Sequence, residues 1–337
     1  RDTPASCHST RMLRFILTLV LLLPLSGCYY MQAAKGQLEL NRKREPIDDV
    51  LQDETTTPGL AARLRLVQEA RQFSVDELGL PDNKSYYTYA DIERDYVVWN
   101  VFAAPEFSLQ PETWCFPVAG CVAYRGYFSK DDAVRVSERL AAKGFDVRVG
   151  GVAAYSTLGR FNDPILSSMM NWDDTQLVAV LFHELAHQVL YIKGDSGFNE
   201  SFATAVEEYG VQRWLESRGR EEDIGAYFEA RQLREDLMSL VADARLELED
   251  LYAGNLDDED KRRHKDIRLR ELGEDVAELL RKNGRDPTNW MNGEWNNARL
   301  VSMNLYEGRL PEFRALLEQC AQRIECFYEK ARALAGR

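Results

Sequence analysis

The sequence predicts an α+β protein that is mostly helical, with a small N-terminal β-sheet and a long helical hairpin arm. Segments rich in β-branched and aromatic residues, at strand length, fall between about residues 86 and 155. After about residue 173 the apolar residues recur at helical spacing. Two long charged stretches follow between residues 206 and 283, and the first keeps an apolar stripe.

The composition is that of a globular protein and argues against a nucleic-acid partner. The chain has 337 residues, 45% of them hydrophobic and 29% charged, which suits one large domain or two ordinary ones. Its 42 basic residues stand against 55 acidic ones, for a formal net charge of -13. A surface of that sign repels phosphate backbones, so we expect no binding to nucleic acid.

Residues 12–28, MLRFILTLVLLLPLSGC, have the order of an export signal: a basic start, an apolar run and a small-residue end. The apolar run is shorter than the roughly 20 residues that a membrane-spanning helix needs, and Pro24 interrupts it. The last four residues, Leu25 to Cys28, resemble the bacterial lipobox. In that motif the cysteine is lipidated and becomes the first residue of the mature chain.

We therefore expect removal of residues 1–27, which combine an over-extended start with the signal peptide, and lipidation at Cys28. Met12 is the expected true start of the protein. The alternative is an ordinary secretory signal. Tyr29, rather than Asp, follows the cysteine, as in lipoproteins exported to the outer membrane. The expected location is the cell envelope, with the lipid in the outer membrane and the protein facing the periplasm.

Three regions are expected in the mature chain. Residues 28–85 form an N-terminal helical region, and residues 86–172 a small sheet-containing lobe. Residues 173–337 form a helical catalytic lobe that includes the arm at about 206–283. The charges of the arm suit a solvated outer face, which also offers a surface to a protein partner. The expected strands are Tyr96–Phe102, Cys121–Phe128 and Phe145–Tyr155, with a helix over 129–143 before the last of them.

Four cysteines remain when Cys7 and the lipidated Cys28 are set aside: Cys115, Cys121, Cys320 and Cys326. In an oxidising compartment they suggest two disulfides, with three connectivities open. We favour a bond between Cys115 and Cys121, because the residues between them can form a turn. A zinc knuckle is the weaker alternative, since neither pair has the usual ligand spacing.

The motif that carries chemistry is His183-Glu184-Leu-Ala-His187, in a helical segment over 173–194. Residues four apart lie on one face of a helix, so both imidazoles can bind one ion. Glu184 lies one step round the helix, where its carboxylate can reach a water on that ion. This is the arrangement of zinc peptidases, with two histidine ligands and a glutamate general base. The alternative is a pair of structural histidines on a half-buried helix.

The segment Asp195-Ser-Gly-Phe-Asn-Glu-Ser-Phe-Ala203 resembles the Asn-Glu pattern on the second active-site helix of gluzincins. The resemblance implies that Glu200 is the third protein ligand, which leaves a fourth position for water. Thr204 stands where these enzymes usually have an aspartate, so the carboxylate partner of the histidines stays open. Glu207 and Glu208 are candidates, although we favour them as surface carboxylates. His264 lies in a basic cluster and is expected at the surface.

These motifs, together with Thr113–Phe128, resemble the bacterial zinc aminopeptidase lipoproteins over nearly the whole mature chain. The resemblance implies a zincin-like fold, one zinc ion per chain, and peptide substrates cleaved at a free N-terminus. It also suggests Tyr306 as the donor to the oxyanion, with Tyr155 and Asn297 as alternatives. Two other functions remain open: an envelope endopeptidase, or a scaffold or regulatory lipoprotein with a structural zinc. The intact Glu184 argues against the scaffold, because a structural site has no need of a base.

Overall fold

The computed structural model describes residues 24–116, 120–154, 156–157, 161–303 and 308–336. It divides the chain into two compact units, Arg1–Lys43 and Arg44–Arg337. The described part of the first unit is mainly helix α2 (Pro24–Arg42), so most of the expected leader, with Met12, lies outside the described residues. Among the residues that the structure describes, no helix combines the length and apolar character needed to cross a bilayer.

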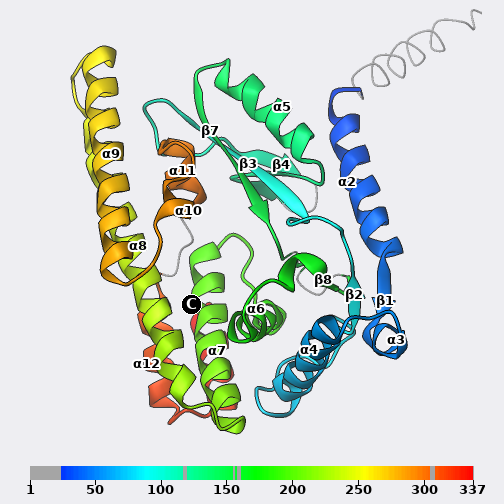
Figure 1. Cartoon of the computed structure of the whole chain (residues 1–337). Coiled ribbons are helices and arrows are strands. Elements are labelled where there is room, and N and C mark those ends of the chain that lie inside the picture. The colour runs from blue at the N-terminus through cyan, green and yellow to red at the C-terminus, as the bar shows by residue number, and fades with distance from the viewer. Residues whose placement is uncertain (1–23, 117–119, 155, 158–160, 304–307, 337) are drawn as a thin grey trace, which may run out of the picture. The chain divides into compact units, whose positions relative to one another are not determined.

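The larger sheet of the second unit has β3 (Val98–Pro105) at its centre, between β6 (Arg125–Tyr127) and β7 (Phe145–Val152). Both pairings are antiparallel, with Trp99 opposite Tyr127 on one side and Gly151 on the other. Helix α5 (Lys130–Ala141) and helix α11 (Asn297–Ser302) both pack against β3 and β7 (Figure 1). Ser129 caps α5, because its hydroxyl accepts a hydrogen bond from the Asp132 N–H.

The expected strand over 121–128 is divided in the structure. Its first residues belong to β5 (Gly120–Val122), which pairs with β4 (Trp114–Phe116) in a hairpin, and only its later part, β6, joins the larger sheet. A disulfide joins Cys115 to Cys121 across that hairpin, and a second joins Cys320 to Cys326. Each disulfide closes a local turn between two cysteines six residues apart. The bond between Cys115 and Cys121 is the one that the sequence favoured.

A second, smaller sheet was not expected from the sequence, because its strands have only two or three residues. It consists of β1 (Arg44–Pro46), β2 (Thr88–Ala90) and β8 (Ile165–Leu166), in that order. Helices α3 (Ile47–Gln52) and α4 (Pro58–Asp76) lie between its first two strands along the chain, as the N-terminal helical pattern predicts. After β8 a short 3₁₀ turn, Ser167–Met169, leads toward the central helices.

The central pair of helices is α6 (Asp174–Ala186) and α7 (Ser196–Ser217), which pack side by side (Figure 1). Asp173 caps α6 and Asp195 caps α7. Helix α6 ends with His187 at its C-cap, earlier than the expected Gly194. Gly194 instead has a φ of 87°, a left-handed conformation that glycine adopts without strain, in the turn before α7.

The helical arm consists of α8 (Glu222–Ala253) and α9 (Asp258–Lys282), which pack against each other. It begins at Glu222 and not near residue 206, because residues 206–217 belong to α7, a core helix that is buried on several sides. The arm has an apolar seam of its own. The buried residues of that seam are Leu237, Val241, Ala244, Leu248, Leu269, Leu272, Val276 and Leu280.

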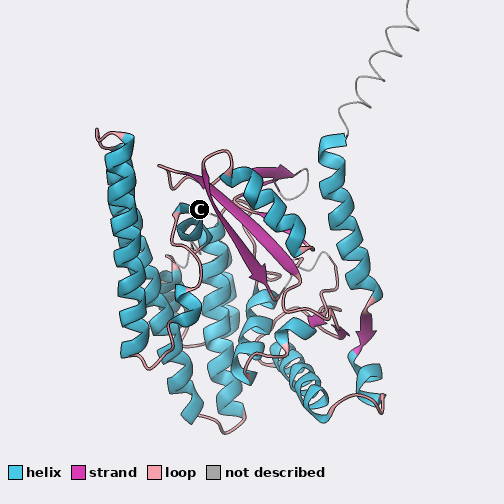
Figure 2. Ribbon diagram, turned by 45° about the horizontal axis from the view of Figure 1, so that its top comes forward, coloured by secondary structure: helices cyan, strands magenta, loops and turns pink. Residues whose placement is uncertain are grey.

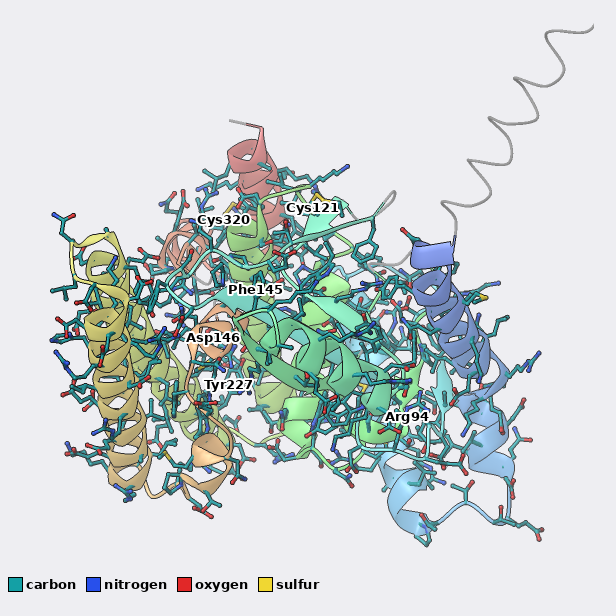
Figure 3. The ribbon with its side chains drawn as sticks, turned by 90° about the horizontal axis from the view of Figure 1, so that it is seen from above. Arg94, Cys121, Phe145, Asp146, Tyr227 and Cys320 are labelled. Atoms are coloured by element: carbon teal, nitrogen blue, oxygen red, sulfur yellow. A yellow bond between two sulfur atoms is a disulfide. The ribbon has the colours of Figure 1, made fainter. Side chains whose placement is uncertain are left out.

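The arm is also fastened to the larger sheet. Lys265 of α9 is 5% exposed and donates to Asp146 Oδ2 of β7 at 2.7 Å and to the Glu106 carbonyl at 2.9 Å. Figure 3 labels Asp146, which also accepts from the Asn297 N–H at 2.8 Å. A buried lysine is stable only when it is paired in this way.

The remaining helices are α10 (Thr288–Met291), α12 (Leu310–Gln319) and α13 (Ile324–Ala335). Phe327 of α13 stacks on Phe202 of α7, and Phe313 of α12 meets both rings edge to face, so the three form an aromatic core. Figure 2 shows how far helices outweigh strands in the described chain. The mostly helical α+β class expected from the sequence is therefore confirmed.

Candidate metal centre

Helix α6 and helix α7 bring three side chains to one point. His183 Nε2 lies 3.2 Å from His187 Nε2 and 3.3 Å from Glu200 Oε2, and His187 Nε2 lies 3.6 Å from Glu200 Oε1. A tetrahedral ion with bonds of about 2.0–2.1 Å would hold its ligands about 3.3 Å apart. The three side chains therefore have the mutual spacing that such an ion requires, and they form a candidate metal-binding group.

The two histidines of α6 lie close together because they are four residues apart on one helix. The carboxylate of α7 reaches them because of the turn between the two helices. Asn199 closes that turn: its side-chain nitrogen donates to the Ile192 carbonyl at 2.8 Å, and its oxygen accepts from the Ile192 N–H at 2.7 Å. Asn199 is 1% exposed, so both bonds form away from water. The asparagine of the Asn-Glu pair thus sets the position of Glu200, the next residue on α7.

The histidines differ in their protonation. Burial disfavours the charged form of His183, but hydrogen bonds to Glu200 and Glu207 outweigh it and raise the pKa of His183 to about 10. Burial, with the neighbouring His183 charge, lowers the pKa of His187 to about 4. Burial opposes ionisation of Glu200 as well, yet the hydrogen bond from His183 holds the pKa of Glu200 below its ordinary value. His183 is therefore an imidazolium between two ionised carboxylates, Glu200 and Glu207.

Glu207 is the second partner of His183, and the expectation that it is a surface carboxylate was wrong. Its Oε2 lies 3.0 Å from His183 Nδ1, and its side chain is 12% exposed. Histidine ligands of metals usually donate their other N–H to a carboxylate, which leaves the free nitrogen for the ion. Glu207 follows Glu200 by seven residues, two helical turns, so the spacing could have indicated that both carboxylates face α6.

Glu208 is buried too, but it faces away from the metal-binding group. It accepts hydrogen bonds from Arg231 at 3.2 Å and from Arg314 at 2.7 and 2.8 Å. The surface expectation for Glu208 was therefore wrong as well. Its partners lie on α8 and α12, so the residue joins three helices.

Glu184 is absent from the group of three ligands and lies in a small pocket beside α6. The pocket is lined by Tyr86, Ala154, Pro164 and Met169, among others. Burial raises the pKa of Glu184, against the lowering effects of the His183 charge and a hydrogen bond from Ser156. A carboxylate with a raised pKa is a better proton acceptor near neutral pH than an ordinary one.

Tyr86 is a residue of this pocket that the sequence did not single out. It is 3% exposed, and its φ of 68° is unusual for a residue with a side chain. Burial and the charge of Glu184 both raise the pKa of its hydroxyl well above the ordinary value. No local motif marks Tyr86, because only the folded chain brings residue 86 next to residue 184.

The other sequence candidates lie elsewhere. Tyr306 and Tyr155 lie outside the described residues. Asn297 is fully buried and structural: its side-chain nitrogen donates to the carbonyls of Pro105, Glu106 and Ser108, and its oxygen accepts from Tyr252. Asn297 is therefore not a donor to an oxyanion. His264 is exposed, as expected.

The fold and site define a class: a mostly helical α+β protein in which two packed helices hold two histidines and a glutamate as candidate metal ligands. The model of the family described as "Putative aminopeptidase" matches residues 28–337, and the chain belongs to that family. In the same comparisons, neither a curated protein nor a solved structure matched the chain.

Proposed function

We propose that the protein is a zinc-dependent peptidase that removes residues from peptides with a free N-terminus. The observation that carries the proposal is the mutual spacing of His183, His187 and Glu200, with the half-buried Glu184 on the same helix as the two histidines. Two nitrogens and one carboxylate oxygen suit zinc, and such a set leaves one position open. Membership of the aminopeptidase family supports the choice of peptides as substrates and of free N-termini as cleavage sites.

Zinc bound by these ligands would lower the pKa of a water molecule and polarise the carbonyl of the substrate. Glu184 would be the general base that takes a proton from the attacking water, and the acid that returns it to the leaving amine. Its burial suits both steps, because the raised pKa allows the residue to hold the proton between them. Glu207 orients His183 and fixes which of its nitrogens faces the ion.

Strand β7 is the better of the two edge strands for binding a peptide. The sheet order β6-β3-β7 leaves both outer strands at an edge within the described sheet. The chain beyond β7 reaches the pocket of Glu184, since Ala154 lines it and Ser156 donates to the carboxylate. A substrate paired along β7 would therefore run toward the general base.

The test combines metal analysis with two sets of peptides. The purified protein should contain about one zinc per chain and cleave peptides with free N-termini, while N-acetylated copies stay intact. Glu184→Gln should keep its zinc and lose about 100-fold or more in turnover, because the amide cannot accept a proton. Glu200→Ala should lose zinc, whereas Glu216→Ala, a partly exposed position on the same helix, should not.

Each outcome separates one function from another. Equal cleavage of acetylated peptides would make the protein an endopeptidase. Normal turnover by Glu184→Gln would place the base elsewhere, and zinc without any hydrolysis would favour a scaffold.

We further infer that Cys28 anchors the protein to the outer membrane, facing the periplasm. The lipobox supports this, and the family match begins at the same residue. The intact mass of protein from the membrane fraction should show an acylated chain that starts at Cys28. A mature chain with another first residue and no acyl mass would contradict the anchor.

A further inference from the structure

The base of the arm meets α7 at two adjacent carboxylates. The Tyr227 hydroxyl of α8 donates to Glu207 Oε1 at 2.9 Å, and Arg231 Nε donates to Glu208 Oε1 at 3.2 Å. Tyr227 and Arg231 are four residues apart, so they lie on one face of α8. Figure 3 labels Tyr227. The arm therefore contacts α7 through polar groups, and α7 is also the helix that carries Glu200.

The Glu207 carboxylate uses its two oxygens in different directions. Oε2 faces His183 Nδ1 at 3.0 Å, and Oε1 accepts from Tyr227 at 2.9 Å. A carboxylate with only the first contact could still turn about its terminal bond. The tyrosine removes that freedom, because the second hydrogen bond fixes the plane of the group.

From this geometry we propose that Tyr227 is a positioning residue of the metal centre. The chain of contacts runs from the arm through Glu207 to the imidazole of His183, which then presents Nε2 to the ion. The inference rests on the proposed function, since it concerns the same metal site. It adds that the arm is part of the metal centre, although it supplies no ligand.

The arm offers a matched control for this residue. Tyr252 lies on the same helix α8, and its hydroxyl donates to Asn297 Oδ1 at 2.8 Å. Both tyrosines are partly buried, and the hydroxyl of each donates to a side chain that is 12% exposed or less. Asn297 in turn donates to the carbonyls of Pro105 and Glu106, at the end of β3, so the hydrogen bonds from Tyr252 in the described chain lead to β3 and not to α6.

The experiment measures zinc affinity by competition with a chelator for the full chain and for two variants. Tyr227→Phe should raise the zinc dissociation constant about 10-fold, the lower end of the 10–100-fold effect of outer-shell partners. Tyr252→Phe should leave it unchanged. The visible absorption spectrum of the cobalt-substituted protein should change for Tyr227→Phe only, because it reports the geometry of the ligands.

Thermal unfolding of the metal-free variants separates positioning from stability. Both variants should lose a comparable amount of stability, while only Tyr227→Phe loses metal affinity. Wild-type affinity and an unchanged cobalt spectrum in Tyr227→Phe would overturn the inference, as would equal losses of affinity in both variants. A wild-type chain that binds no zinc would overturn the proposed function instead.

Discussion

Two neighbouring helices of this protein, α7 and α8, bury their side chains in opposite ways. Helix α7 has 22 residues and buries 13 of them, whereas the longer α8, with 32 residues, buries four. The four on α8 form one stripe against α9. Those on α7 point in several directions, toward α6, α4 and α12.

The difference changes what a charged residue means on each helix. On α8 most charges lie outside the stripe and stay solvated, so they say little about function. A carboxylate on α7 loses water when the chain folds, and it needs partners that compensate. Glu200, Glu207 and Glu208 each have such partners, and two of the three lie at the candidate metal site. A charged residue therefore indicates a structural or functional role where its burial would destabilise the fold without a partner.

The largest effect on stability is expected at Gly210 of α7. A Cβ there would lie 2.7 Å from Leu78 Cδ1 and 2.8 Å from Phe182 Cδ2, and both of those side chains are fully buried. Gly210→Ala should therefore lower the free energy of unfolding by about 1–3 kcal/mol, although alanine favours helices. Urea unfolding of the metal-free protein would measure it. Wild-type stability would show that α6 and α7 can move apart at no cost.

The pH dependence of zinc binding tests the buried charges of the site. Burial disfavours the His183 charge, but the bonds to Glu200 and Glu207 hold the pKa of His183 at about 10. Zinc needs the neutral imidazole, so binding releases this proton and affinity rises with pH until the pKa is passed. We expect about a 10-fold rise per unit between about pH 7 and 9.

Chelator competition at three pH values, corrected for the chelator's own protonation, would measure this slope. Glu207→Gln removes one of the charges that stabilise the protonated histidine, so it should flatten the slope. A histidine with an ordinary pKa of about 6.5 would give almost no rise above about pH 7.5. Such a flat profile in the wild-type chain would contradict the charge balance described for the site.

The smallest effect, with the opposite sign, is expected at Gly225 of α8. This helical glycine is exposed, and nothing lies within 4 Å of the position where a Cβ would be. Gly225→Ala should raise the free energy of unfolding by up to about 1 kcal/mol, because alanine loses less backbone entropy in a helix. The same urea experiment would detect it. If both glycine variants shifted stability in one direction, burial would not distinguish the two helices.

Features that depend on neighbours along the chain could be predicted without the fold. The spacing of His183 and His187 places both imidazoles on one face of α6, whatever packs against it. The caps of α5, α6 and α7 have the same short range, since each joins a side chain to a backbone N–H three residues on. The class of fold also follows from local periodicity.

Which distant residues meet depends on how the helices pack, and the sequence did not predict it. The role of Glu207 depends on how α7 lies against α6, and the role of Tyr227 depends on where α8 leaves α7. Asn297 resembled a candidate for catalysis until the fold showed its amide bonded to three carbonyls. These contacts depend on packing between segments far apart in the sequence. Helical periodicity carries no information on that packing. Local spacing was thus enough to find the candidate ligands, while the groups that orient them appear only once the helices are packed.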